Sequence, residues 1–173
     1  MEFNQSKLIK YHKATRILLG ALALFINTLL LDRFVLPTKE TPDRIFSYIS
    51  FSNSTNTYTG TNKYYKGYKF LTDKGFEFST ENAAISNPRI TITHTFLFKN
   101  VIGVYSDDND YSQHLVSSVN GFMLYLYAML GISSLISFCF LQFSKKLTVN
   151  GFYNAILINA MIIFWILWLT WKT

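Results

Sequence analysis

Three long stretches of apolar residues dominate the hydrophobic pattern of this chain, at residues 17–36, 119–143 and 151–171. A helix needs about 20 mostly apolar residues to cross the hydrocarbon core of a bilayer, which is about 30 Å thick. Each stretch has this length, so we predict three transmembrane helices. The parts outside them are a head of residues 1–16, an insert of residues 37–118 and a loop of residues 144–150.

The insert follows a different pattern, in which apolar and polar residues alternate. Alternation is typical of strands with one buried face, and it is clearest in residues 90–99. Four shorter runs predict further strands, at residues 45–51, 64–71, 76–80 and 101–105. The polar residues 52–62 predict an exposed link without strand structure. The predicted fold class is a membrane α+β protein, with a small antiparallel β-rich domain inserted between helices 1 and 2.

The chain has a net charge of +6, and the position of the surplus basic residues is more informative than the total. The insert contains eight basic and eight acidic residues, so the surplus lies in the head, in Lys145 and Lys146, and in Lys172. Lys and Arg next to a span favour the cytoplasmic side of the membrane. We therefore expect no nucleic acid partner, a cytoplasmic N-terminus and an insert outside. The Lys- and Asn-rich composition favours a bacterial inner membrane.

Polar residues inside the predicted spans are the main candidates for specific contacts. Asn27, Ser133 and Asn159 lie near mid-membrane, where an unsatisfied amide is costly. We predict that the three side chains meet between the helices, with Ser134 as the alternative to Ser133. Such hydrogen bonds contribute about 0.6–2 kcal/mol each.

Residues near the outer ends of the spans are predicted to anchor the chain in the membrane. Trp168 and Trp171 fall at the outer end of the third span, where Trp is enriched at membrane interfaces. Asp32 and Arg33 lie near the outer end of the first span, where their charged groups can reach the interface. Membrane lipids are accordingly expected partners.

The insert is rich in aromatic residues but small. A unit of this size has marginal stability alone, so we expect its apolar face to need the helix ends, a second copy or another protein. Its aromatic side chains suit an ordinary sheet core, or else a face that binds a ligand or partner.

Short motifs in the insert point only weakly to chemistry. Asp110, Ser112 and His114 are triad-type residues, but known triads come from distant segments. The acidic residues 107–110 resemble the start of a Ca²⁺ loop, which then lacks the required Gly and Glu. The lone Cys139 and three dispersed histidines, of which His94 is predicted to be buried, do not suit a zinc site. We predict no catalytic, cofactor-binding or metal-binding residues.

These observations favour a non-catalytic accessory or binding subunit, whose outer domain contacts another envelope protein or a second copy. A toxin-immunity protein is one version of this function. A homo-oligomeric channel or transport component, lined by Asn27 and Asn159, is the alternative. A surface enzyme that uses Asp110, Ser112 and His114 is the third hypothesis.

Overall fold

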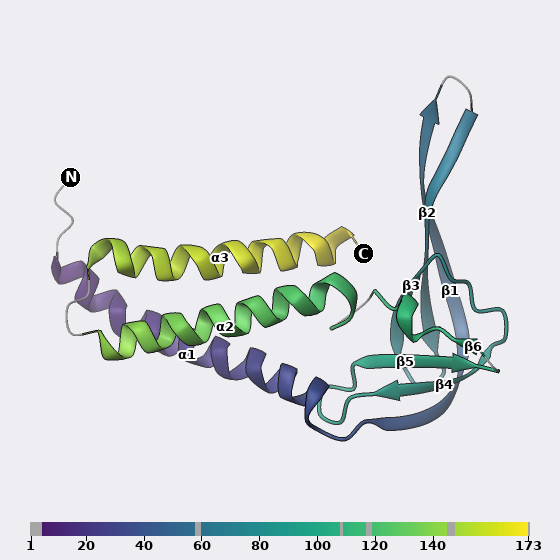
Figure 1. The fold of residues 1–173 in the computed structure, drawn as a ribbon, viewed down its shortest axis with the longest axis horizontal. Coiled ribbons are helices and arrows are strands. Elements are labelled where there is room, and N and C mark those ends of the chain that lie inside the picture. Colours follow the sequence, from purple (N-terminus) through teal and green to yellow (C-terminus); the bar gives the residue numbers. More distant parts are fainter. Residues whose placement is uncertain (1–4, 58–59, 108, 117–118, 145–147, 173) are drawn as a thin grey trace. The chain divides into compact units, whose positions relative to one another are not determined.

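The computed structural model describes residues 5–57, 60–107, 109–116, 119–144 and 148–172, with the backbone alone for 5–10, 52–57, 60–66 and 172. The chain divides into two compact units. We refer to Met1–Leu31 with Tyr125–Thr173 as the helical unit, and to Asp32–Leu124 as the β unit. Figure 1 shows the elements of both.

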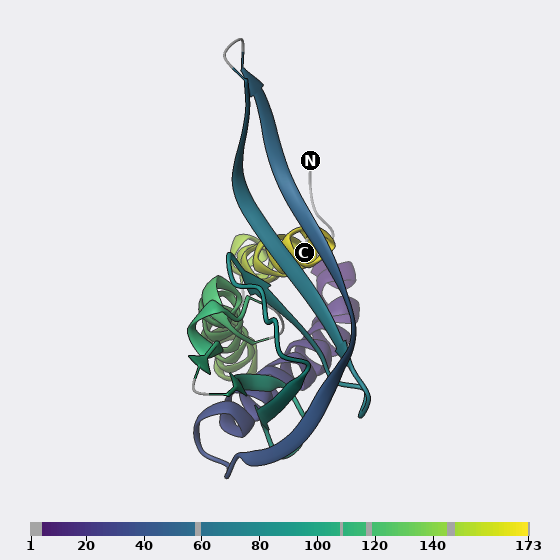
Figure 2. The ribbon, with the colours of Figure 1, turned by 90° about the vertical axis from the view of Figure 1, so that its right-hand side faces the viewer.

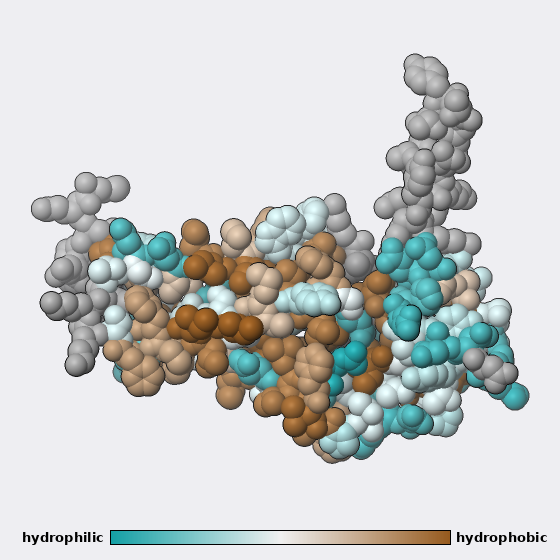
Figure 3. Space-filling view, viewed as in Figure 1, coloured by the Kyte–Doolittle hydropathy of each residue, from teal (hydrophilic) through white to brown (hydrophobic). Residues whose placement is uncertain are grey.

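Three long helices are present, α1 (Gln5–Phe34), α2 (Gly121–Phe143) and α3 (Val149–Lys172). Each contains a segment long and apolar enough to cross a membrane. In the space-filling view, hydrophobic residues cover much of the surface of the helices (Figure 3). The predicted set of three apolar helices is therefore confirmed. Helix α1 also includes most of the basic head and ends three residues before Pro37, where proline commonly follows a helix end.

Small residues let the helices of the helical unit approach closely. A Cβ atom placed on Gly131 of α2 would lie 3.2 Å from a methyl group of Leu30 and 3.3 Å from one of Ile26, both on α1. A Cβ atom on Gly20 of α1 would lie 2.9 Å from the ring of Phe138 on α2. Small residues at such contacts are typical of packed transmembrane helices, because association in lipid depends on close van der Waals contact.

The β unit contains a six-stranded antiparallel sheet in the order β3-β2-β1-β4-β5-β6. The strands are β1 (Lys39–Thr57), β2 (Gly60–Thr72), β3 (Glu77–Glu81), β4 (Arg89–His94), β5 (Val101–Ser106) and β6 (Asn109–Asp110). An antiparallel sheet between the first and second helices agrees with the predicted fold class.

The sheet curls, so that the chain after β6 comes back to β3 at the opposite edge. Thr80 of β3 forms an isolated bridge with Leu115, and the N–H of Val116 donates to the carbonyl of Ser79 at 3.0 Å. The chain after β6 thereby covers part of the edge that β3 would otherwise leave open. Covering an edge satisfies backbone groups that could pair with another chain.

The prediction that residues 52–62 lack strand structure is wrong for residues 52–57 and 60–62, which belong to β1 and β2, while residues 58 and 59 lie outside the described residues. The backbone pairs from Ser52 opposite Lys66 to Thr57 opposite Gly60, with one shift of register between Asn53 and Ser54. Figures 1 and 2 show this part of β1 and β2 as a twisted two-stranded arm that extends beyond the sheet. The segment is rich in Thr, which favours strands. A polar sequence can form such an arm because cross-strand pairing uses the backbone and needs no buried face.

The interior of the β unit holds apolar side chains from several strands. Ile92 and Val104 are fully buried, and Phe70 stacks on Phe78 with ring centroids 5.1 Å apart. Tyr68 continues this aromatic row at 6.1 Å from Phe70. For these three aromatic residues the sheet-core interpretation is therefore confirmed. The insert contains further aromatic residues whose side chains lie outside the described residues, namely Tyr58, Tyr64 and Tyr65.

Candidate functional site

In the helical unit, the mid-helix polar residues form contacts at two places. The amide nitrogen of Asn159 donates to the hydroxyl of Ser137 at 2.9 Å, which links α3 to α2. It also donates to the carbonyl of Ala155 at 2.7 Å. Both side chains are buried, and the amide oxygen of Asn159 has no hydrogen-bond partner among the described residues.

The second place lies between α1 and α2. Asn27 donates to the carbonyl of Ala23 on its own helix at 2.7 Å, and its amide oxygen lies near Gly131. Ser134 is fully buried and donates to the carbonyl of Gly131 at 3.1 Å. Ser133 is half-buried. The described hydrogen bonds thus join Asn159 to Ser137, while Asn27 lies near the turn that holds Ser134.

His12 makes a polar contact that the sequence did not suggest. Its Nε2 atom lies 3.1 Å from the carbonyl oxygen of Leu141. A carbonyl can only accept, so Nε2 carries the proton and donates. Leu141 is in the last turn of α2, whose carbonyls lack partners within the helix. His12 therefore caps the end of α2.

The predicted interfacial tryptophans lie in the last turns of α3. Trp168 is exposed and packs edge-on against Trp165, with ring centroids 5.4 Å apart. Trp171 is the more exposed of the two predicted anchors. Their surfaces are available to lipid, which is what an anchoring role requires.

The β unit has an open cavity of about 570 Å³ whose wall includes His94 and Thr41. His94 lies at the end of β4, where alternate residues face inward, and it is buried as predicted. Its Nδ1 atom lies 2.9 Å from the carbonyl of Thr95, so Nδ1 donates. In the neutral ring, Nε2 then accepts from the Thr41 hydroxyl at 3.1 Å. Both ring nitrogens are occupied, so His94 supports the cavity wall.

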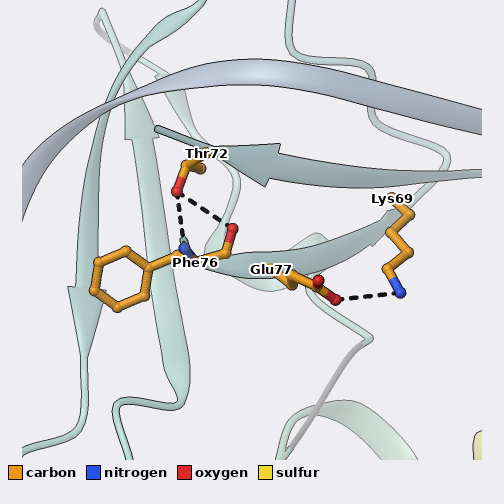
Figure 4. A network of polar contacts seen from close by, with 4 residues as sticks. All are labelled: Lys69, Thr72, Phe76 and Glu77. Carbon is orange, nitrogen blue, oxygen red and sulfur yellow. Dashed lines mark hydrogen bonds and ion pairs between the residues drawn. The ribbon is translucent and has the colours of Figure 1, made fainter. Parts of the chain in front are cut away.

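The turn between β2 and β3 forms another part of this wall. The Thr72 hydroxyl accepts from the N–H of Phe76 at 3.0 Å and lies 3.2 Å from the Phe76 carbonyl, as Figure 4 shows. These contacts fix Phe76, whose ring centroid lies 4.9 Å from that of His94. Across the same strands, Lys69 pairs with Glu77 at 3.3 Å (Figure 4).

The rim of the cavity has a positive charge balance. Lys74 and Lys99 line it, and the carboxylate of Glu77 is shared with Lys69. Lys74 also donates to the carbonyl of Pro42 at 2.6 Å. A cavity with two ammonium groups and the rings of Phe76 and Phe98 suits an anionic group with an apolar part.

Asp110 and Ser112 bond to each other, whereas His114 has a separate partner. Ser112 donates its N–H to Asp110 at 2.8 Å, and its hydroxyl accepts from the N–H of Val104 at 3.2 Å. The Nδ1 atom of His114 lies 3.2 Å from the carbonyl of Glu81. Hydrogen bonds from the hydroxyl and N–H of Ser112 lower the pKa of Asp110. These contacts hold the turn after β6 in place, whereas a triad needs a nucleophile bonded to its base.

The acidic turn before β6 is also used within the fold. Both carboxylate oxygens of Asp107 accept from the amide of Asn87 at 2.8 Å. Asp108 lies outside the described residues. Within the part of the chain that the structure describes, no group of three or more His, Cys, Asp or Glu side chains is placed to hold a metal ion.

Within the β unit, the most informative residue is Asp32, which was predicted to lie at the membrane interface. It is 0% exposed, and its carboxylate accepts from the N–H groups of Leu97 at 2.8 Å and Phe98 at 2.9 Å. The turn between β4 and β5 therefore wraps its donors around a carboxylate in the last turn of α1. An acidic residue inside an apolar span was the only sequence signal.

The same turn corrects the predicted extent of the fourth strand. Alternation over residues 90–99 predicted a longer strand, but β4 ends at His94 and residues 96–98 form a turn. Asn120, just before α2, donates to the carbonyl of Val101 at 2.7 Å. Residues next to two helix ends thus hold the β4–β5 hairpin.

A second surface of interest lies on β1. Phe46, Tyr48 and Ile49 are 78%, 62% and 60% exposed. Tyr48 lies beside a smaller groove of about 370 Å³, which Tyr68 and Ile85 also line. Because successive side chains of a strand point to opposite faces of the sheet, Tyr48 and Ile49 lie on opposite faces, and the exposed aromatic surface beside the groove is that of Tyr48.

Comparisons with models of known protein families, with characterised proteins and with solved structures find no match to this chain.

Proposed function

We propose that this chain is a non-catalytic membrane protein that crosses the bilayer three times and uses its β unit to bind another membrane or envelope protein. The observation that carries the proposal is the exposed Tyr48 of β1, which lies beside the groove that Tyr68 and Ile85 also line. Aromatic side chains of this kind commonly supply the energetic centre of protein interfaces.

The polar contacts of the β unit support a binding role over catalysis. The ring of His94 is fully hydrogen-bonded, and the hydroxyl of Ser112 accepts from a backbone N–H. Their groups are thus engaged in holding strands and turns. A nucleophile would instead need an adjacent base free to take its proton.

The proposed orientation follows from charge next to the spans. The head and the loop at Lys145 and Lys146 are basic, while the insert is balanced. The N-terminus is therefore cytoplasmic and the β unit is outside, in the inner membrane of a bacterium.

Crosslinking in native membranes tests the proposal. The full chain is treated with a short crosslinker, purified, and compared with the variant Tyr48→Ser. We expect a discrete adduct for the wild type and a loss of about tenfold in the variant, since each 1.4 kcal/mol of interface energy changes an equilibrium tenfold.

The matched control is Tyr105→Ser, which removes an exposed aromatic residue from β5, on a different strand. It should leave the adduct unchanged. A wild-type chain that gives one uncrosslinked species after gentle extraction, with neither a partner nor a second copy, would contradict the proposal.

A further inference from the structure

The turn between β4 and β5 carries an exposed apolar tip. Phe96, Leu97 and Phe98 are 44%, 51% and 39% exposed. The turn is tightly closed, because the N–H of Thr95 donates to the carbonyl of Asn100 at 3.0 Å and the N–H of Asn100 donates to the Thr95 hydroxyl at 3.0 Å. Three consecutive exposed apolar residues on a rigid turn need a reason, since water-exposed apolar area is unfavourable.

The position of the tip follows from the residue that holds it. Asp32 belongs to the segment Tyr11–Phe34, which is apolar enough to span a membrane. Its carboxylate bonds the N–H groups of Leu97 and Phe98 directly. Phe34 and Val35, which follow it, are also exposed. The tip therefore lies within hydrogen-bond distance of Asp32, which is two residues before the end of this segment.

Charges beside the tip match the chemistry of a lipid surface. The ammonium group of Lys39 lies 4.5 Å from the centroid of the Phe96 ring, and Lys99 follows Phe98 directly. Apolar side chains flanked by cations suit the boundary between acyl chains and phosphate headgroups, where aromatic rings and basic side chains are favoured.

We infer that the tip Phe96-Leu97-Phe98 inserts into the outer boundary of the same bilayer that α1 crosses, and that Asp32 is the residue that positions it. The inference rests on the proposed membrane crossing, but it is independent of the binding partner. The β unit is then held at the membrane surface by a third contact, besides its two covalent connections to helices.

Site-directed quenching on the full chain in liposomes tests this. The exposed Cys139 is replaced by Ala, and single cysteines at Leu97, Phe46 and Leu24 carry an environment-sensitive fluorophore. Phe46 is the exposed control in the β unit, and Leu24 is the exposed control within the first span. Each sample is exposed to a quencher attached to lipid and to iodide in water.

The expected result is that the labels at Leu97 and Leu24 are quenched by the lipid quencher and escape iodide, while the label at Phe46 is quenched by iodide. A label at Leu97 that iodide quenches, with Leu24 still in lipid, overturns the tip insertion alone. A label at Leu97 that neither quencher reaches means that protein covers the tip, and also overturns it. A label at Leu24 that iodide quenches overturns the membrane crossing itself.

The role of Asp32 has a separate readout. Asp32→Asn should increase the mobility of a nitroxide at Leu97 and reduce its contact with lipid, while a nitroxide at Phe46 is unchanged. Unchanged mobility at Leu97 would show that Asp32 does not position the tip.

Discussion

At the scale of single residues, Asp32 is the clearest case of a charged side chain whose place is set by the donors around it. A buried carboxylate is costly unless hydrogen bonds replace its lost water. The N–H groups of Leu97 and Phe98 supply this replacement, one to each oxygen. The turn needs the carboxylate equally, since residues 96–98 have left the strand ladder.

We predict that Asp32→Asn loosens this turn. The amide keeps one acceptor oxygen but places an NH₂ group against the second backbone N–H, and a hydrogen bond to a charged group contributes about 1.5–3 kcal/mol. The amides of Leu97 and Phe98 should therefore exchange with deuterium at least about tenfold faster.

Arg33→Gln is the control for this experiment, because it alters a charge at the same helix end without touching the turn's donors. It should leave both exchange rates unchanged. Equal protection of Leu97 and Phe98 in the wild type and in Asp32→Asn would show that the contact contributes little.

Asp110 gives a prediction with a defined pH dependence. Its folded-state pKa is lowered by the hydroxyl and N–H of Ser112. A lowered pKa contributes stability above the unfolded value of about 3.9, and that stability is lost as the pH falls through the folded value. The site is at the surface, so we expect no more than about 1 kcal/mol.

Thermal unfolding of Asp110→Asn at pH 7 and below pH 3 measures this effect. The variant should have a slightly lower Tm than the wild type at pH 7, and the two values should converge in acid. A Tm difference that stays constant over this pH range would contradict the assignment.

At the scale of elements, the helical unit illustrates which polar contacts a sequence can and cannot specify. Hydropathy predicts the spans because each must bury its backbone in hydrocarbon. Counting the helical rise of about 1.5 Å per residue places Asn159 and a serine of α2 at a similar depth along their helices. Which serine faces Asn159 depends on how α2 and α3 cross, and the structure has Ser137 there.

The strands also show which features a sequence can specify and which it cannot. Alternation of Ile90, Ile92 and His94 predicts β4 because every second residue is buried. The end of β4 was missed because a distant side chain, Asp32, captures the next backbone donors. The arm of β1 and β2 was missed because its pairing depends on the backbone register and leaves no apolar pattern to read.

A double-mutant cycle on Asn159 and Ser137 measures the contact between α3 and α2. The single variants Asn159→Ala and Ser137→Ala and the double variant are unfolded in detergent. We expect a coupling energy of about 0.6 kcal/mol, with about 1.7 kcal/mol as the upper end of such measurements in membranes.

The same cycle on Asn159 and Ser133 is the matched control, one helical turn away on α2. Coupling there should be near zero. A larger coupling to Ser133 than to Ser137 would mean that the two helices pack in a different rotation.

At the scale of the whole molecule, the proposed function depends on which side of the membrane the β unit occupies. The insert has equal numbers of basic and acidic residues, so its own charge does not favour either side. Orientation is then decided by short basic flanks, the head and the loop at Lys145 and Lys146. A binding surface on β1 can meet an outer partner only in this orientation.

Cysteine labelling of intact spheroplasts tests this orientation in the Cys139→Ala background. Asp73→Cys lies in the exposed turn between β2 and β3, and Asn150→Cys lies exposed at the start of α3. A maleimide that cannot cross the membrane should label Asp73→Cys at once, and should label Asn150→Cys only after the membrane is permeabilised. The reverse result would place the β unit in the cytoplasm, where the partner must then be sought. Immediate labelling of both sites would mean that α2 does not cross the bilayer, because its two ends would then lie on one side.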